Sequence, residues 1–204
     1  MIVISLEKKD NSSSYIVTID NEKYLLDEEV VLKYRLFPNS IIDEDILSSL
    51  IKYNDYMSFY NKALNYSIKY GKPSKMIKKY LIDKECSIEY ADKIVEELIN
   101  KKILNDNILC KGQINYLIST YNGILMIKKK LFDKGFTKEV IDNELEELDY
   151  DLYYDFLNKF YIKNKDKYNK YDSYMAKMKL KSYLLQRGYT ISDINNLDNR
   201  VERK

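Results

Sequence analysis

The chain has 204 residues, of which 45% are hydrophobic, and a formal net charge of +2. This apolar fraction is ordinary for a folded protein and argues against a wholly disordered chain. The sequence has no histidine, so the usual general base near neutral pH and the commonest transition-metal ligand are both missing. The two cysteines, Cys86 and Cys110, form no CxxC pair. We therefore expect no metal site and no cofactor.

The sequence also indicates where the protein works. No apolar run approaches the roughly 20 residues that a helix needs to cross a bilayer. The N-terminal residues 1–9 lack the pattern of a signal peptide. Two unpatterned cysteines suit a reducing compartment. We expect a cytoplasmic protein with no membrane partner.

Residues 1–54 predict a small β structure followed by short helices. Three runs rich in β-branched and aromatic residues are separated by polar turn clusters, at residues 1–6, 15–19 and 24–26. These runs predict a three-stranded meander. Two short helices are expected next, over residues 27–36 and 41–52, each with acidic residues at its start, where negative charge favours the helix dipole.

From residue 55 onward the sequence predicts helices that repeat. Three segments match one another position by position: residues 76–87, 126–137 and 179–190. Each has an apolar second residue and a leucine four positions later, then a basic residue, a turn residue, an apolar or aromatic residue and a hydroxyl residue. A period of about fifty residues is typical of stacked helical units. We predict a mainly α protein with three tandem three-helix repeats in an elongated array. Their expected bounds are 55–105, 106–150 and 151–204, the last being short at its C-terminus.

Within these repeats, the hydroxyl and acidic residues that precede the helices are expected to cap them. Asp106 is the predicted cap of the first helix of the second repeat, and Thr137 and Thr190 are the predicted caps of the last helices. The run 163–170, rich in lysine and asparagine, predicts either a longer helix end or a loop.

Tyrosine is unusually frequent, with 21 residues, many of them along the predicted helical stripes. Such residues mostly pack in or beside a core with a solvated hydroxyl. They could also serve as stacking platforms for single-stranded bases. Packing is the interpretation that we favour.

Charge is spread unevenly along the chain. Residues 1–59 carry six basic and eleven acidic residues, whereas residues 151–204 carry twelve and seven. This asymmetry favours contact with nucleic acid or with an acidic protein surface. Solvated lysines on ordinary helices explain it equally well.

Basic residues also recur at equivalent places in the three repeats. They form our set of candidate partner-binding residues: Lys78, Lys84, Lys128, Lys129, Lys130, Lys134, Lys177, Lys179, Lys181 and Arg187. A basic ridge of this kind could track phosphates or acidic loops. However, basic residues near helix C-termini also favour the dipole by about 0.3–1 kcal/mol each. That effect alone would account for Lys84, Lys134 and Arg187, so both interpretations stay open.

Motifs of known catalytic sites are absent from the sequence. It contains no Walker A sequence, no GxGxxG, no nucleophile elbow and no zinc-ligand spacing. We expect no catalytic residues and no enzyme.

Three short motifs carry a resemblance to a known family. They are the L-x-x-K/R-G-aromatic turn at residues 131–136 and 184–189, the linker 103–106, and the segment 122–127. With the leading β segment and three helical units, they resemble the RecX family of bacterial recombinase regulators, in particular the longer members from Gram-positive bacteria. The first repeat departs from the pattern, because Glu85 stands where a glycine is expected.

The resemblance implies a non-enzymatic protein that binds the RecA filament on DNA. Such a protein slows ATP hydrolysis and strand exchange, limits the coprotease activity that triggers the SOS response, and so acts in DNA repair and recombination. It implies that the basic residues above meet RecA or DNA, with contact to single- or double-stranded DNA weak or indirect. We expect a monomer. The alternative is a helical-repeat DNA-binding protein that acts independently of RecA.

Overall fold

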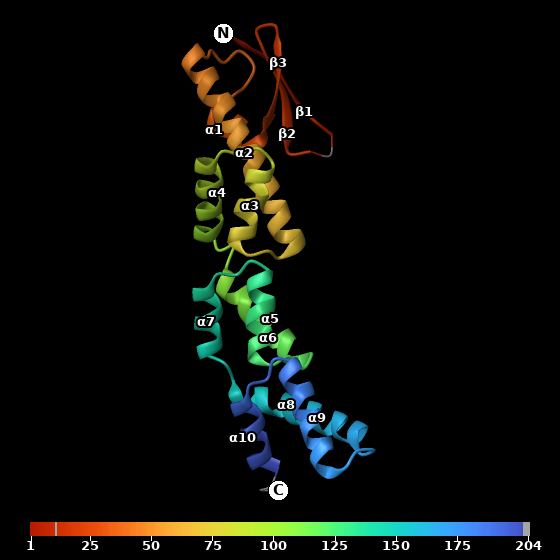
Figure 1. The fold of residues 1–204 in the computed structure, drawn as a ribbon. Coiled ribbons are helices and arrows are strands. Elements are labelled where there is room, and N and C mark those ends of the chain that lie inside the picture. Colours follow the sequence, from red (N-terminus) through yellow and green to blue (C-terminus); the bar gives the residue numbers. More distant parts are fainter. Residues whose placement is uncertain (11, 202–204) are drawn as a thin grey trace. The chain divides into compact units, whose positions relative to one another are not determined.

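The structure, a computed structural model, describes the backbone of residues 1–10 and 12–201 and the side chains of these residues as far as Leu197 (Figure 1). The chain divides into two compact units. The first comprises Met1–Gly71 with Ile77–Ile103, and the second comprises Lys72–Met76 with Leu104–Lys204.

The first unit opens with the expected antiparallel meander. Its strands are β1 (Val3–Lys8), β2 (Ser14–Ile19) and β3 (Glu22–Asp27), in the order β1-β2-β3. Val17 on the central strand pairs with Leu6 and with Tyr24. Val17 and its neighbours on the same face, Val3, Ile19 and Leu26, are buried. This sheet therefore has one apolar face that needs a cover, as a three-stranded sheet must.

Two helices follow the sheet, and the second is longer than predicted. The short α1 (Glu28–Lys33) is capped by Asp27, whose carboxylate accepts from the Glu29 amide. The next helix, α2 (Glu44–Tyr70), runs unbroken for 27 residues. The predicted break after residue 52 is wrong, because the buried stripe from Leu50 to Met57 continues across the polar residues 54 and 55. The boundary placed at residue 54 falls inside this helix, and the division of the chain into four segments stays a prediction.

Helices α3 (Ser74–Asp83) and α4 (Ile88–Asn100) contribute the rest of the first unit. Residues 72–76, which include the start of α3, count with the second unit. Ser87 caps α4 by accepting from the Tyr90 amide at 3.2 Å. Ile77 and Leu81 of α3 are fully buried, as is Ile94 of α4.

As far as residue 201, the second unit contains helices and no strand. In chain order they are α5 (Asp106–Ser119), α6 (Ile124–Asp133), α7 (Lys138–Glu146), α8 (Tyr150–Lys165), the 3-10 turn η1 (Asp166–Tyr168), α9 (Ser173–Gln186) and α10 (Ile191–Val201). This order confirms the prediction of mainly helical repeats after a small sheet. Residues 163–170 are a helix end followed by a short 3-10 turn.

The caps of these helices are largely those predicted. Thr137 caps α7, and Thr190 exchanges two hydrogen bonds with Asp193 at the start of α10. The prediction that Asp106 caps α5 is wrong, because Asn105 accepts from the Ile108 amide instead. The carboxylate of Asp106 turns to Ser74 and accepts from both its amide and its hydroxyl, at 2.9 and 2.6 Å.

One core joins the helices of the second unit. Its buried members include Ile127 and Leu131 of α6, Tyr153 of α8 and Tyr189 in the turn before α10. Most tyrosines of the chain are buried or half-buried, which agrees with the packing interpretation. The rings of Tyr153 and Tyr189 lie 5.9 Å apart in this core.

Candidate interaction surface

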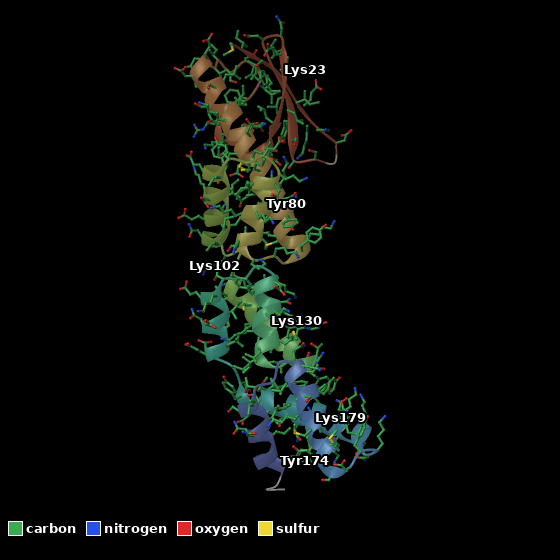
Figure 2. All side chains as sticks on the ribbon, in the orientation of Figure 1. Lys23, Tyr80, Lys102, Lys130, Tyr174 and Lys179 are labelled. Carbon is green, nitrogen blue, oxygen red and sulfur yellow. The ribbon has the colours of Figure 1, made fainter. Side chains whose placement is uncertain are left out.

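Helices α3, α6 and α9 present the recurring lysines, and their buried leucines fix which face points outward. At the end of each helix the same backbone bond closes the turn: the amides of Cys86, Phe136 and Tyr189 donate to the carbonyls of Leu81, Leu131 and Leu184. Because these leucines are fully or almost fully buried, the neighbouring lysines must point away from the core. Figure 2 labels Lys130 on α6 and Lys179 on α9.

Two of the recurring lysines are neutralised within their own repeat. Lys78 forms an ion pair with Asp92, and Lys128 forms one with Asp142 at 2.7 Å. The hydrogen bond from Lys128 holds the pKa of the Asp142 carboxyl below its ordinary value. Each pair joins the second helix of a repeat to the third, with the same spacing of fourteen residues.

The third repeat lacks this ion pair. The same spacing from Lys181 leads to Asn195, whose amide carries no charge. Among the residues that the structure describes, Lys181 therefore has no carboxylate partner, although it occupies the place of Lys78 and Lys128.

The second recurring set, Lys84, Lys134 and Arg187, is mostly engaged inside the protein. Arg187 donates from Nε to the Tyr121 carbonyl at 3.0 Å and from a terminal nitrogen to the Thr120 carbonyl at 2.6 Å. These carbonyls follow the C-terminal end of α5, where orphan acceptors are expected. Lys134 donates to the side-chain oxygen of Gln113. In this set, Lys84 alone is exposed with no partner among the described residues.

The remaining candidates fall into similar groups. Lys130 donates to the Asn122 side-chain oxygen at 2.8 Å, and Lys179 lies over the ring of Tyr171, 4.7 Å from its centroid. Lys177 is exposed. Lys129 is exposed too and has no partner in the described part of the chain. The candidates thus do not form one uniform ridge: several stabilise the fold, while Lys84, Lys129 and Lys181 carry charges that nothing described neutralises.

The structure adds one basic residue that the sequence reasoning did not single out. Lys165 is the last residue of α8. It lines a groove of about 720 Å³ that Lys177 and Lys181 of α9 also line. The run of lysines at 163–170 was the available signal. The fold of the following turn η1, which the sequence left open, decides which of them faces the groove.

The arrangement of the Arg187–Tyr189 turn was also not foreseen. The Gly123 amide donates to the Arg187 carbonyl at 2.9 Å, and the Leu125 amide donates to the Gly188 carbonyl at 3.0 Å. A Cβ at Gly123 would lie 2.1 Å from the Tyr189 nitrogen, so the two backbones touch. This contact fixes α9 and α10 against the start of α6.

A buried polar cluster at the base of the third repeat is structural. Asp193 is 4% exposed and accepts from the Tyr153 hydroxyl at 3.1 Å and from the Tyr154 hydroxyl at 3.3 Å. Burial, assisted by the charge of Asp193, raises the pKa of Tyr153 above its ordinary value. A phenol held protonated in this way cannot serve as a base near neutral pH. The cluster anchors α10 to α8.

Metal-binding clusters and membrane-spanning helices are both missing from the described residues. These residues contain no group of three or more histidine, cysteine, aspartate or glutamate side chains that could hold a metal ion. They also contain no helix that is both long enough and apolar enough to span a membrane.

Comparison with known proteins gives a consistent result. Residues 153–197 match the model of the third three-helix domain of RecX. The "Regulatory protein RecX" of Listeria monocytogenes serotype 4b (strain CLIP80459) is 30% identical over 193 residues, covering 92% of this chain and 70% of the relative. The protein of the same name from Finegoldia magna is 27% identical over 197 residues, covering 93% of this chain and 95% of that relative.

Two solved structures have the same fold. A crystal structure of a regulatory protein RecX aligns with a TM-score of 0.78 at 18% identity, covering 97% of this chain and 98% of the other. The crystal structure of RecX from Lactobacillus salivarius aligns with a TM-score of 0.69 at 21% identity, covering 74% of this chain and 98% of the other. At such identities the likeness concerns the fold alone.

Proposed function

The chain belongs to the RecX family of regulatory proteins, and we propose that it binds the RecA–DNA filament and restrains it. In this proposal it slows ATP hydrolysis and strand exchange by RecA and limits the SOS coprotease activity of the filament. It acts as a monomer and by binding alone, without chemistry of its own.

The observation that supports this proposal best is the uncompensated charge on α6 and α9. Lys128 and Lys78 already hold a carboxylate, so a partner that recruits them must first break an ion pair. Lys129 and Lys181 have no such partner among the described residues, so an acidic group that approaches them gains the full interaction. Complementary charge of this kind speeds association and selects the partner.

The repeated helical units suit a polymeric partner. A filament offers the same surface many times, and a protein built from similar units can touch it at several places. Modest contacts that form on one molecule add by raising the effective concentration of the next. No single deep pocket is needed for tight binding in this arrangement.

An ATPase assay tests the proposal. Single-stranded-DNA-dependent ATP hydrolysis by the cognate RecA is measured while the protein is added at substoichiometric amounts. We expect hydrolysis to fall and filament lifetime to shorten. Unchanged hydrolysis and unchanged filament lifetime would contradict the proposal.

The same preparation separates this function from DNA binding that is independent of RecA. Affinity for bare DNA is measured at several salt concentrations, because each phosphate neutralised by a lysine contributes about 0.9 to the slope of log affinity against log salt. We expect weak binding. High affinity with a steep slope, together with no effect on RecA, would favour the DNA-binding alternative.

A further inference from the structure

A groove on α9 lies at the end of the third repeat. We call it the α9 groove; α8, η1, α9 and α10 line it, and its volume is about 720 Å³. Leu180, Leu184 and Ile194 contribute buried aliphatic surface, and Lys165, Lys177 and Lys181 contribute ammonium groups. Among its described lining residues Asp166 supplies the single carboxylate, so the groove is basic overall, with an aliphatic patch at Leu180, Leu184 and Ile194.

The α9 groove corresponds to a place on α6 that holds a polypeptide. Counting from the matched leucines Leu131 and Leu184, Ala176 and Lys177 correspond to Gly123 and Ile124. On α6, this stretch receives the backbone of the Arg187–Tyr189 turn. On α9, no segment of the described residues occupies the corresponding place. The third repeat therefore presents on α9 a face equivalent to the one on α6 that holds the Arg187–Tyr189 turn.

The α9 groove differs from the corresponding face of α6 in its charge and in its free backbone groups. Ile124 is replaced by Lys177, and the Ala176 amide already donates to the Asp172 carbonyl at 2.8 Å, inside the longer helix α9. On α6 the Arg187–Tyr189 turn accepts hydrogen bonds from the amides of Gly123 and Leu125. On α9 an occupant cannot accept from the Ala176 amide in the same way, because that amide is already bonded within the helix. The occupant must be held by the aliphatic side chains and by the lysines.

We propose that the α9 groove binds an acidic polypeptide segment that inserts one apolar side chain against Leu180 and Leu184. The carboxylates of the segment meet Lys165 and Lys181. The proposal goes beyond RecA regulation, because it concerns the chemistry of the bound segment and does not depend on which protein supplies it.

A polypeptide fits the groove better than single-stranded nucleic acid does. Nucleic acid of this kind is held by aromatic rings on which bases stack. Two tyrosines line the groove: Tyr161 packs against the core of the second unit, and the ring of Tyr171 already has the ammonium groups of Lys179 and Lys170 over it, 4.7 and 5.3 Å from its centroid. The buried surface of the groove is aliphatic, which suits a leucine, methionine or phenylalanine side chain.

Selection from a phage-displayed library of random dodecapeptides on the full chain, without RecA, tests the proposal. We expect enriched peptides with several acidic residues around one large apolar residue. Measured by fluorescence anisotropy, these peptides should bind Lys165→Glu/Lys181→Glu about tenfold or more weakly than the unchanged protein. Ala176→Phe, which fills the groove without changing its charge, should weaken them as well.

A matched control keeps the result specific. Lys9→Glu/Lys23→Glu makes the same change of net charge on the N-terminal sheet and should leave peptide affinity unchanged. Enriched peptides without acidic residues, or equal affinities for the groove and control variants, would overturn the proposal. So would a selection that enriches no peptide while an oligothymidylate binds in a manner that requires Lys165 and Lys181. Because RecA is absent throughout, this result and that of the ATPase assay are independent.

Discussion

Gly188 lies against Met126 so closely that a Cβ at residue 188 would be 2.4 Å from the Met126 backbone nitrogen. The same relationship recurs one repeat earlier, where a Cβ at Gly135 would lie 2.5 Å from the Met76 side chain. Both glycines have positive φ, of 86° and 96°. The glycine of the L-x-x-K/R-G-aromatic turn is thus required twice over, for its backbone conformation and for close contact.

Replacing Gly188 by alanine should destabilise the protein. The left-handed conformation costs an L-residue about 1–2 kcal/mol, and the added methyl group meets backbone that cannot move aside. We expect a loss of more than about 2 kcal/mol in the free energy of unfolding, measured with urea. Gly112→Ala is the control, because nothing lies within 4 Å of the place that a Cβ would take there, inside α5. That variant should gain about 0.5–1 kcal/mol, and equal effects at both sites would contradict the packing at Gly188.

Replacing Glu85 by glycine should stabilise the protein, the opposite of the effect expected at Gly188. Glu85 occupies the glycine position of the turn in the first repeat and has a φ of 67°. Removing its side chain relieves the left-handed strain, partly offset by the greater freedom of glycine in the unfolded chain. We expect a gain of about 0.5–1 kcal/mol in the same urea experiment. A loss of stability would mean that the Glu85 side chain makes a contact that outweighs the strain.

Arg187→Lys separates structure from charge. Lysine keeps the positive charge but cannot reproduce the fork that reaches the Thr120 and Tyr121 carbonyls. Hydrogen bonds from a charged donor contribute about 1.5–3 kcal/mol, so we expect a destabilisation of about that size or less, since Arg187 is half-exposed. The proposed inhibition of RecA, measured per folded molecule, should stay the same. Normal stability with lost inhibition would instead identify Arg187 as a contact residue.

The sequence alone predicted the repeated helices, but it did not predict which of their surface residues have partners within the protein. In each repeat an apolar residue stands four positions before the matched leucine, as Ile127 does before Leu131. This spacing was enough to predict the helices, because residues four apart lie on one face of a helix. The continuity of α2 was not predicted, because the consecutive polar residues Asn54 and Asp55 resemble a break between two helices. The helix is held by buried residues on either side of them, such as Leu50 and Met57. The role of Arg187 could not be predicted, since its acceptors lie 66 and 67 residues away in the chain.

The ion pairs illustrate the same limit. The spacing from Lys78 to Asp92 and from Lys128 to Asp142 is visible in the sequence, but it has meaning only once the second and third helices of a repeat are packed side by side. With that packing known, Asn195 becomes the residue that distinguishes Lys181 from its counterparts.

The ion pair of Lys128 and Asp142 should be visible in a pH titration. The pKa of Asp142 is lowered in the folded protein by the hydrogen bond from Lys128. The stability that this pair contributes is therefore present above the unfolded pKa of the aspartate and lost as the pH falls through the lowered folded pKa. In Lys128→Gln we expect the Asp142 pKa, followed by NMR of the side-chain carboxyl, to rise toward its ordinary value. An unchanged pKa would show that Lys128 is as available to a partner as Lys129.

The most direct test of the proposed function compares two double variants in binding to preformed RecA–single-stranded-DNA filaments. Lys129→Glu/Lys181→Glu reverses the two uncompensated charges on α6 and α9, and Lys9→Glu/Lys23→Glu makes the same change of net charge on the sheet. We expect the first variant to bind about tenfold more weakly or worse, and the second to bind like the unchanged protein. Equal affinities for all three proteins would contradict a RecA interface on these lysines.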